Sequence, residues 1–115
     1  MNKQERAGAG FGFWLILIWL IGLTAFILYD KIKEEYFPIV IGGDSSVSIP
    51  SVLADAEANI DVGLIWIDAH PDYNTFESTT TGNIDNLSLA AINGYKCNEL
   101  RSYHNGKIVQ PSRTV

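Results

Sequence analysis

An uncharged apolar stretch of 19 residues, numbers 11–29, limits what this chain can fold into more than any other feature. A helix of that length spans roughly 28 Å at 1.5 Å per residue, close to the thickness of the bilayer hydrocarbon core. The remaining chain is too short to bury a helix that is apolar all round. We therefore expect a transmembrane helix at residues 11–29, between a polar, disordered tail (residues 1–10) and a charged connector (residues 30–36).

Two other interpretations of this stretch stay open. It could be a buried core helix, or the apolar part of a cleaved signal peptide, although no Ala-x-Ala site follows it. Lys3 and Arg6 precede the stretch and Lys31 and Lys33 follow it, so the positive-inside rule does not fix the orientation. We expect a single-pass membrane protein and place the soluble part in the cytoplasm, with its orientation left open.

The net charge of the chain limits the classes of partner that it is expected to bind. The formal net charge is −5, and the acidic excess follows residue 35. An acidic body disfavours nucleic acid and suits a cation site. The single cysteine, Cys97, can form no internal disulfide and lacks the spacing of a metal or redox motif.

Residues 37–115 begin with an alternation of strand and helix patterns. Residues 37–41 predict a buried strand, which Gly42 and Gly43 end. Ser45 or Ser46 then caps a helix that runs to Ala56, and residues 62–67 predict a second strand. This order predicts a right-handed βαβ unit with parallel strands, and hence an α/β fold.

Three metal-ligand types, Asp68, His70 and Asp72, follow the second strand at alternate positions. Side chains two apart point to the same side of an extended chain, so we expect all three to converge on one point. Carboxylates with an imidazole suit a hard or borderline divalent cation such as manganese. Plain polar loop residues are the alternative interpretation of this pattern.

The rest of the chain predicts shorter elements. Residues 73–86 form a polar loop, and a short helix opens at Asn86 or Ser88, runs to Ile92 and stops at Gly94. Residues 107–109 predict a short strand, and residues 111–115 resemble the start of another.

The combination of these motifs is more specific than any one of them. The strand ending Ile-Gly-Gly-Asp, the helix, the strand ending Ile-Asp-Ala-His-Pro-Asp-Tyr-Asn-Thr and the loop Thr-Thr-Thr-Gly-Asn resemble the arginase or ureohydrolase family, which includes arginase, agmatinase and formimidoylglutamase. The Thr-Thr-Gly-Asn loop is more similar to the arginase branch than to the agmatinase branch. The resemblance implies a truncated three-layer, parallel-sheet α/β domain over residues 37–115. It also implies two manganese ions whose shared hydroxide attacks a guanidinium carbon and releases urea.

The resemblance assigns roles to individual residues. It implies metal ligands at Asp68, His70 and Asp72, with Asp68 bridging both ions. It implies contacts to the amino and carboxylate groups of a substrate such as L-arginine at Asn74, Thr81 and Asn83. Asp44 matches a family Asp beside the site.

Two positions depart from the family pattern. Ser45 stands where the family has a ligating His, and Asp85-Asn86 stands where it has His-Gly. Asp85 therefore occupies the position of a proton-transferring His, with a lower pKa and a shorter reach. The last two family ligands come from a later strand, which we do not find in these residues. We expect weak or partial manganese occupancy.

These observations predict an arginase-type hydrolase, acting on linear amidine C–N bonds by family, that is impaired or inactive as this chain. One alternative is a homo-oligomer or second chain that supplies the missing aspartates. Another is a non-enzymatic single-pass membrane protein that uses the ureohydrolase-like stretch as a scaffold.

Overall fold

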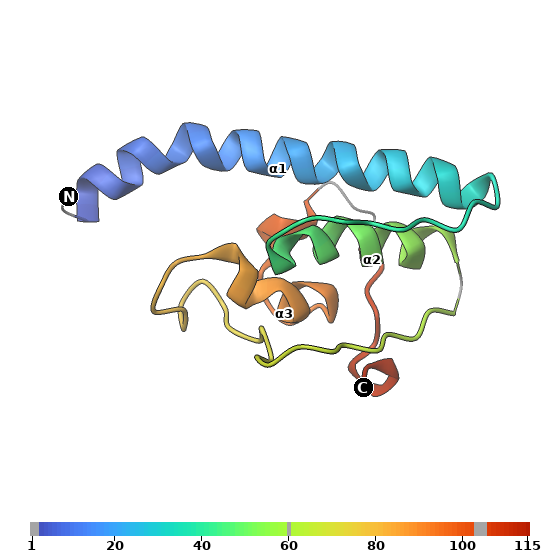
Figure 1. Cartoon of the computed structure of the whole chain (residues 1–115). Coiled ribbons are helices and arrows are strands. Elements are labelled where there is room, and N and C mark those ends of the chain that lie inside the picture. The colour runs from blue at the N-terminus through green and yellow to red at the C-terminus, as the bar shows by residue number, and fades with distance from the viewer. Residues whose placement is uncertain (1–2, 60, 103–105) are drawn as a thin grey trace.

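The computed structural model describes residues 3–59, 61–102 and 106–115. A long helix, α1 (Lys3–Lys33), lies along α2 (Ser48–Ala58), and α3 (Ser88–Ile92) lies on the other side of α2 (Figure 1). The described residues also include four short 3-10 helices: η1 (Ser45–Val47), η2 (Ile84–Leu87), η3 (Asn98–Arg101) and η4 (Pro111–Arg113).

Helix α1 is longer than the sequence predicted. It begins at Lys3, within the predicted disordered tail, and ends at Lys33, within the predicted connector. One stripe of α1 packs against α2 and buries Ile21 and Ala25, four residues apart on one helix face. The opposite side leaves large apolar side chains in solvent, including Trp19 and Phe26.

The described part of α1 from Leu15 to Lys33 is long and apolar enough to cross a membrane, with a mean hydropathy of 2.0. Core helices of soluble proteins and signal sequences share that length and composition. This structure places α1 on the folded part of the chain, with most of its surface uncovered.

The core is built from α2, α3 and the turns that follow. The predicted helix after Gly43 is confirmed, as η1 followed by α2, and Pro50 lies in the first turn of α2, where its missing N–H is tolerated. Ile49 and Leu53 of α2 meet Leu87, Leu100 and the buried thiol of Cys97 in one apolar cluster. Each fully buried side chain of this size contributes about 1.5–3 kcal/mol of burial free energy.

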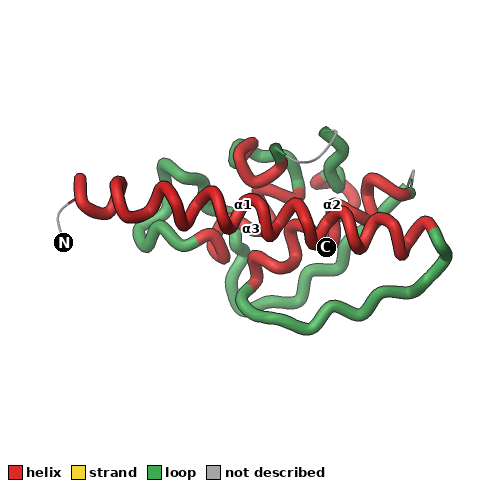
Figure 2. Tube along the Cα trace, turned by 90° about the horizontal axis from the view of Figure 1, so that it is seen from above, coloured by secondary structure: helices red, strands yellow, loops and turns green. Residues whose placement is uncertain are grey.

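The two predicted strands are extended but are not paired with each other in the described residues. Among the described residues none is assigned to a β-strand, and Figure 2 shows residues 37–41 and 62–67 as loops. One isolated β-bridge within the described residues joins Leu64 to Thr114 in parallel. Leu64 N donates to Arg113 O (2.9 Å), and Val115 N donates back to Leu64 O (3.0 Å). The strand prediction is wrong here because a strand is defined by a neighbouring backbone, which these segments largely lack.

The predicted short helix that Gly94 stops is confirmed as α3. Gly94 adopts φ +77°, the left-handed conformation that ends helices. The predicted strand at 107–109 is replaced by an irregular segment that docks on α3. Val109 N donates to Ile92 O (3.1 Å), and Asn93 Nδ2 donates to Val109 O (2.9 Å).

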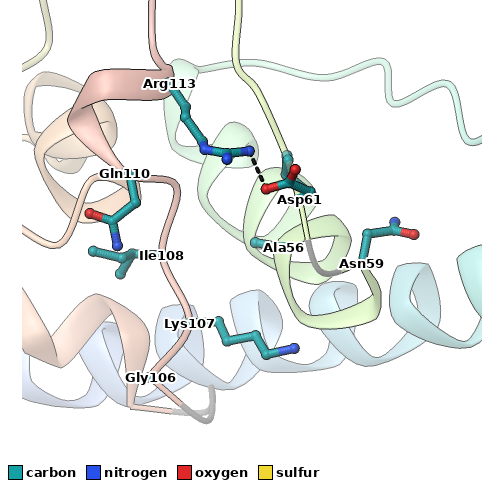
Figure 3. Close-up of a pocket in the computed structure, with 9 residues that line it drawn as sticks. Ala56, Asn59, Asp61, Gly106, Lys107, Ile108, Gln110 and Arg113 are labelled. Atoms are coloured by element: carbon teal, nitrogen blue, oxygen red, sulfur yellow. Dashed lines mark ion pairs between the residues drawn. The ribbon is translucent and has the colours of Figure 1, made fainter.

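The carboxyl-terminal segment is tied to the start of the second extended segment. Arg113 pairs with Asp61 at one side of a cavity of about 400 Å³, which Lys107 and Gln110 also line (Figure 3). Together with the Leu64–Thr114 bridge, this ion pair holds the end of the chain beside residues 62–67. The predicted start of another strand at residues 111–115 is wrong, because residues 111–113 form the 3-10 helix η4 and only the isolated bridge at Thr114 follows.

Candidate functional site

The three predicted metal ligands lie where the second extended segment ends, but they do not converge. Asp68 Oδ1 accepts a hydrogen bond from the backbone N–H of His70 (2.9 Å), which turns the chain at this point. The imidazole of His70 is 80% exposed and lies 3.8 Å from Asp68 Oδ1. Asp72 is only 6% exposed and adopts φ +46°. The alternation of an extended chain is therefore lost before Asp72, and its side chain turns inward.

The buried end of this turn is anchored by backbone groups. The carbonyl oxygen of Asp72 accepts from Leu89 N (3.0 Å) and Ala90 N (3.2 Å), two amides in the first turn of α3. Amides in the first turn of a helix have no partner within it, so Asp72 satisfies two of them. This pairing explains why Asp72 is held in the interior while His70 is not.

An acidic cluster, defined here as Asp68, Asp72 and Asp85, surrounds this position. Burial raises the pKa of the Asp72 carboxyl, the negative charges of Asp68 and Asp85 raise it further, and hydrogen bonding from Ser45 opposes the shift. Asp72 Oδ2 and Asp85 Oδ1 are both buried without a hydrogen-bond partner. The cluster thus holds the Asp72 carboxyl in an environment that disfavours its charge.

The two positions that depart from the family pattern meet at this cluster. Ser45 lies in η1 and Asp85 in η2, and these two 3-10 helices pack against each other. Asp44, the predicted neighbour of the site, instead caps η1, because its Oδ1 accepts from Ser46 N (2.9 Å). Sequence reasoning treated the two substitutions separately, and no local signal indicated that both would lie beside Asp72.

The side chains present do not fit a pair of manganese ions. Among the described residues, no three His, Cys, Asp or Glu side chains are grouped so that they could hold a metal ion. The carboxylates of the acidic cluster are suitable donors for a hard cation, but the imidazole of His70 points to solvent and Ser45 offers only a neutral hydroxyl. The expected convergence of Asp68, His70 and Asp72 is therefore not seen, and their role as ligands stays a prediction.

The predicted substrate-contacting residues share one exposed loop. Asn74, Thr81 and Asn83 are all exposed at its surface. Thr81 Oγ1 accepts from Asn83 N (3.2 Å) and from Asn86 Nδ2 (2.7 Å), while Asn86 O accepts from Asn74 N (3.0 Å). Asn86 thus links both ends of the loop, a role that sequence reasoning missed because it depends on contacts across a turn. Substrate contact at these positions stays a prediction.

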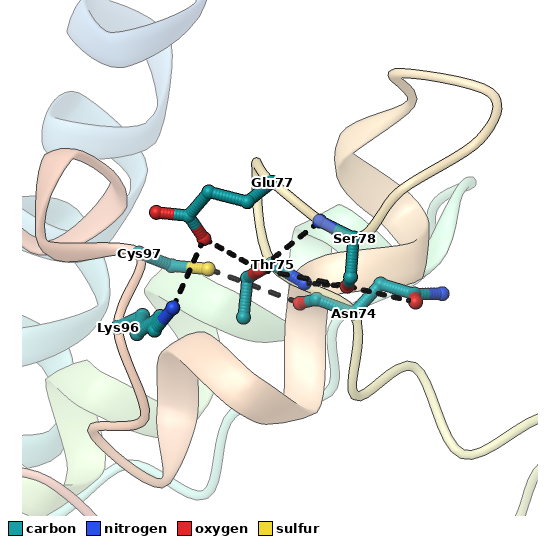
Figure 4. Close-up of polar contacts among 6 residues, drawn as sticks. All are labelled: Asn74, Thr75, Glu77, Ser78, Lys96 and Cys97. Atoms are coloured by element: carbon teal, nitrogen blue, oxygen red, sulfur yellow. Dashed lines mark hydrogen bonds and ion pairs between the residues drawn. The ribbon is translucent and has the colours of Figure 1, made fainter.

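A second set of contacts orders the loop between these positions (Figure 4). The hydroxyl of the buried Thr75 donates to Glu77 Oε2 (2.7 Å), and Ser78 Oγ donates to Asn74 Oδ1 (3.1 Å). Lys96 pairs with the same Glu77 oxygen at 3.4 Å. Hydrogen bonding from Thr75 lowers the pKa of Glu77, and Lys96 lowers it further. The loop is held by side chains, so it presents its exposed polar groups in a defined arrangement.

Comparison with known proteins identifies the fold to which this geometry belongs. A sequence model of the arginase family matches residues 25–110, most of the chain. The chain belongs to the arginase family. It is 43% identical over 63 residues to the arginase of Bacillus subtilis, covering 55% of this chain and 21% of that one. It is 37% identical over 79 residues to the arginase of Saccharomyces cerevisiae, covering 65% of this chain and 24% of that one.

The similarity to arginases extends from the sequence to the three-dimensional structure. The crystal structure of arginase from Bacillus cereus superposes with a TM-score of 0.82 at 33% identity, covering 88% of this chain and 36% of that chain. Residues after Lys33 make up far less than 88% of the sequence, so the superposition includes part of α1. The chain spans about a quarter of the length of its curated arginase relatives. The family resemblance predicted from the motifs is confirmed.

Proposed function

We propose that this chain derives from a ureohydrolase that acts on a guanidino compound such as L-arginine, and that it is impaired or inactive in the 115-residue form. Membership of the arginase family supports the reaction class. The observation that supports an impaired activity is the environment of Asp72. It is buried among carboxylates and beside Ser45, where the family pattern calls for an imidazole ligand.

The chemistry of the acidic cluster supports this proposal. A cation site needs donors that converge, and the exposed imidazole of His70 leaves the cluster with carboxylates alone. A proton-transfer group needs access to substrate, but one oxygen of Asp85 is buried without a partner, and its charge raises the pKa of Asp72. Loss of one oriented catalytic group commonly costs about 10²–10⁴ in rate.

The test is urea release from L-arginine with added manganese, with intact Bacillus subtilis arginase as the positive control. We expect no release above background from the 115-residue chain. Turnover at a rate within about 100-fold of the control would contradict the proposal, because a single lost catalytic group already costs that much.

Titration calorimetry with manganese tests for a residual site independently of turnover. Wild-type binding that weakens in Asp68→Ala would mean that a partial site persists, and no binding would favour a scaffold. The double variant Ser45→His with Asp85→His restores the family residues at both positions. If it gains neither affinity nor activity, the two substitutions are not what limits the site.

A second candidate function is that of a membrane-anchored scaffold. It is favoured by the apolar side chains that α1 leaves in solvent, such as Phe13, Trp19 and Phe26. Removing them from water would be favourable by about 25 cal/mol for each Å² buried. Flotation with phosphatidylcholine liposomes tests the anchor. The control is a variant chain that lacks the residues before Leu28. Wild-type chain that stays at the bottom of the gradient would rule the anchor out.

A further inference from the structure

The side of α1 that faces away from α2 has a broad apolar surface, which we call the outer face. In Figure 1 the rest of the described chain lies below α1, on the side of α2. At about 3.6 residues per turn, the side chains of the outer face cover roughly half of the helix circumference. They are between 41% and 70% exposed and include Phe13, Ile16, Trp19, Leu23, Phe26 and Ile27. Soluble monomers rarely expose an apolar surface of this extent unless it binds something.

The opposite side of α1, the docked face, is fixed by its packing on α2. Ile21 and Ala25 are 6% and 9% exposed there, and both lie near the middle of the uncharged stretch. The superposition on Bacillus cereus arginase covers 88% of this chain, so it includes part of α1 in its docked position. The contact between α1 and α2 is therefore part of the fold.

A helix that crossed a bilayer could not keep this contact. Ile21 and Ala25 would lie close to the bilayer midplane, and α2 would have to enter the hydrocarbon with them. Asp55 of α2 lines the same cavity as Leu28 and Ile32 of α1, so a carboxylate would follow. A charged side chain at that depth is costly, and lipid offers no hydrogen bonds to exposed backbone. Crossing would thus require α1 to leave α2 and uncover both surfaces.

The composition of the outer face favours lipid over a partner helix. Ile16, Leu20 and Leu23 have the spacing of a coiled-coil seam, but such a seam is narrow and has charged residues along its edges. No charged residue interrupts the uncharged stretch. Trp19 and Phe26, which lie on one line at the edge of the outer face, are 66% and 70% exposed. One partner helix would leave them in water, whereas a membrane surface covers the whole outer face.

The charges at the end of the outer face indicate the class of lipid. Asp30 and Glu34 follow Ile27 by three and seven residues, which places them on the same side of the helix, and both are exposed. Lys31 is paired with Glu34 at 2.8 Å. Anionic lipids attract clusters of Lys and Arg, but this end of α1 is not a basic cluster and the whole chain has a net charge of −5. Zwitterionic lipid therefore suits this surface best.

We propose that α1 lies in the plane of a zwitterionic membrane surface. Its outer face enters one leaflet, while Ile21 and Ala25 stay packed on α2. Interfacial helices bury their apolar face by about 5–10 Å and keep a polar face in water, and here the folded part of the chain takes the place of that polar face. The inference rests on the proposed membrane-anchored scaffold and adds that both ends of α1 stay on one side of the membrane. It is independent of the proposed loss of hydrolysis.

The test measures the depth of Trp19 in phosphatidylcholine vesicles. Trp14 and Trp66 are replaced by Phe, so that Trp19 is the only fluorescent indole. The full chain is reconstituted from detergent into vesicles that carry a spin-label quencher either near the headgroup or near the end of the acyl chain. Trp19 lies near the middle of the uncharged stretch, so a spanning helix would place it near the bilayer centre. We expect stronger quenching by the label near the headgroup.

Three variants separate the two faces of α1. Phe26→Asp on the outer face should lower vesicle binding by about tenfold or more, because it removes the burial of a large apolar side chain. Ile67→Asp, at a 94% exposed position away from α1, is the matched control and should bind like wild type. Ala25→Leu should leave binding unchanged but speed hydrogen exchange within α2 of the bound protein, because it overpacks the docked face.

Four results would overturn the proposal. Stronger quenching by the deep label, with hydrogen exchange in α2 unaffected by Ala25→Leu, would establish a spanning helix and leave the anchor itself intact. Absence of vesicle binding would remove the anchor and this inference together. A dimer that Phe26→Asp dissociates, without vesicle binding, would make a second copy the occupant of the outer face. Binding that requires phosphatidylserine would refute the zwitterionic surface.

Discussion

Replacing Asp72 by Asn should stabilise this protein. Asp72 is 6% exposed, its Oδ2 atom is buried without a hydrogen-bond partner, and Asp68 and Asp85 lie close enough to disfavour its charge. Asn has the same shape, carries no charge and tolerates the left-handed φ of +46° that this position requires. The backbone carbonyl that accepts from Leu89 and Ala90 is unaffected.

The magnitude follows from the buried, unpaired carboxylate oxygen. An unsatisfied buried polar group costs about 1–3 kcal/mol, and more when it is charged. The amide of Asn can donate to a neighbouring carboxylate, so we expect a gain of about 1–2 kcal/mol at pH 7. For a chain of this size, each kcal/mol of added stability raises Tm by roughly 4–8 °C.

The gain should depend on pH in a defined direction. Because the pKa of Asp72 is raised in the folded state, the native protein holds the proton more tightly than the unfolded chain does. The penalty is therefore present at neutral pH and disappears as the pH falls below the raised folded pKa. The advantage of Asp72→Asn over wild type should shrink on acidification.

The assay is urea unfolding followed by circular dichroism at pH 7 and pH 4.5, in detergent with EDTA. Asp72→Ala is the control. It removes the same charge, but Ala in the left-handed backbone conformation lowers the free energy of unfolding by about 1–2 kcal/mol. An Asn variant that is no more stable than wild type at pH 7, or whose advantage is the same at both pH values, would refute the reasoning.

Three further substitutions test the packing around α3. Gly94→Ala should destabilise by more than about 1 kcal/mol in thermal melts, because φ is +77° and the new Cβ would lie 2.7 Å from Ile108 Cδ1. Asn93→Ala should cost about 2–3 kcal/mol in urea unfolding, because it removes the donor to the buried Val109 carbonyl; a change under 0.5 kcal/mol would exclude this role. Lys96→Ala should leave Tm unchanged, since its carboxylate partner is exposed; a clear fall in Tm would show that the pair contributes more than a surface ion pair.

Local patterns in the sequence predicted the helices of the folded part well. The helix after Gly43 was expected, although its cap is Asp44 and not the predicted Ser45 or Ser46, and Gly94 ends α3 as predicted. Such signals act within one or two turns of the chain, so they need no tertiary contact to be effective.

Local patterns gave wrong predictions where the structure depends on pairing with a distant backbone segment or on a turn in the direction of the chain. Residues 37–41 have strand composition but remain unpaired, because a strand exists only where a neighbour accepts and donates its hydrogen bonds. The alternating side-chain directions of an extended chain were expected to bring His70 and Asp72 together. They do not, because Asp72 has a left-handed backbone conformation and its carbonyl oxygen accepts from amides of α3. Neither event has a signal at the residue itself.

The order of motifs determined the family by itself, and composition determined that α1 would be a long apolar helix. These are properties of consecutive residues, so they can be read along the chain. Tertiary structure alone decided that Ser45 and Asp85 meet at a buried Asp72, that α1 lies along α2, and that a cleft separates the two extended segments. Those outcomes depend on burial and on contacts between residues distant in sequence, which no local pattern encodes.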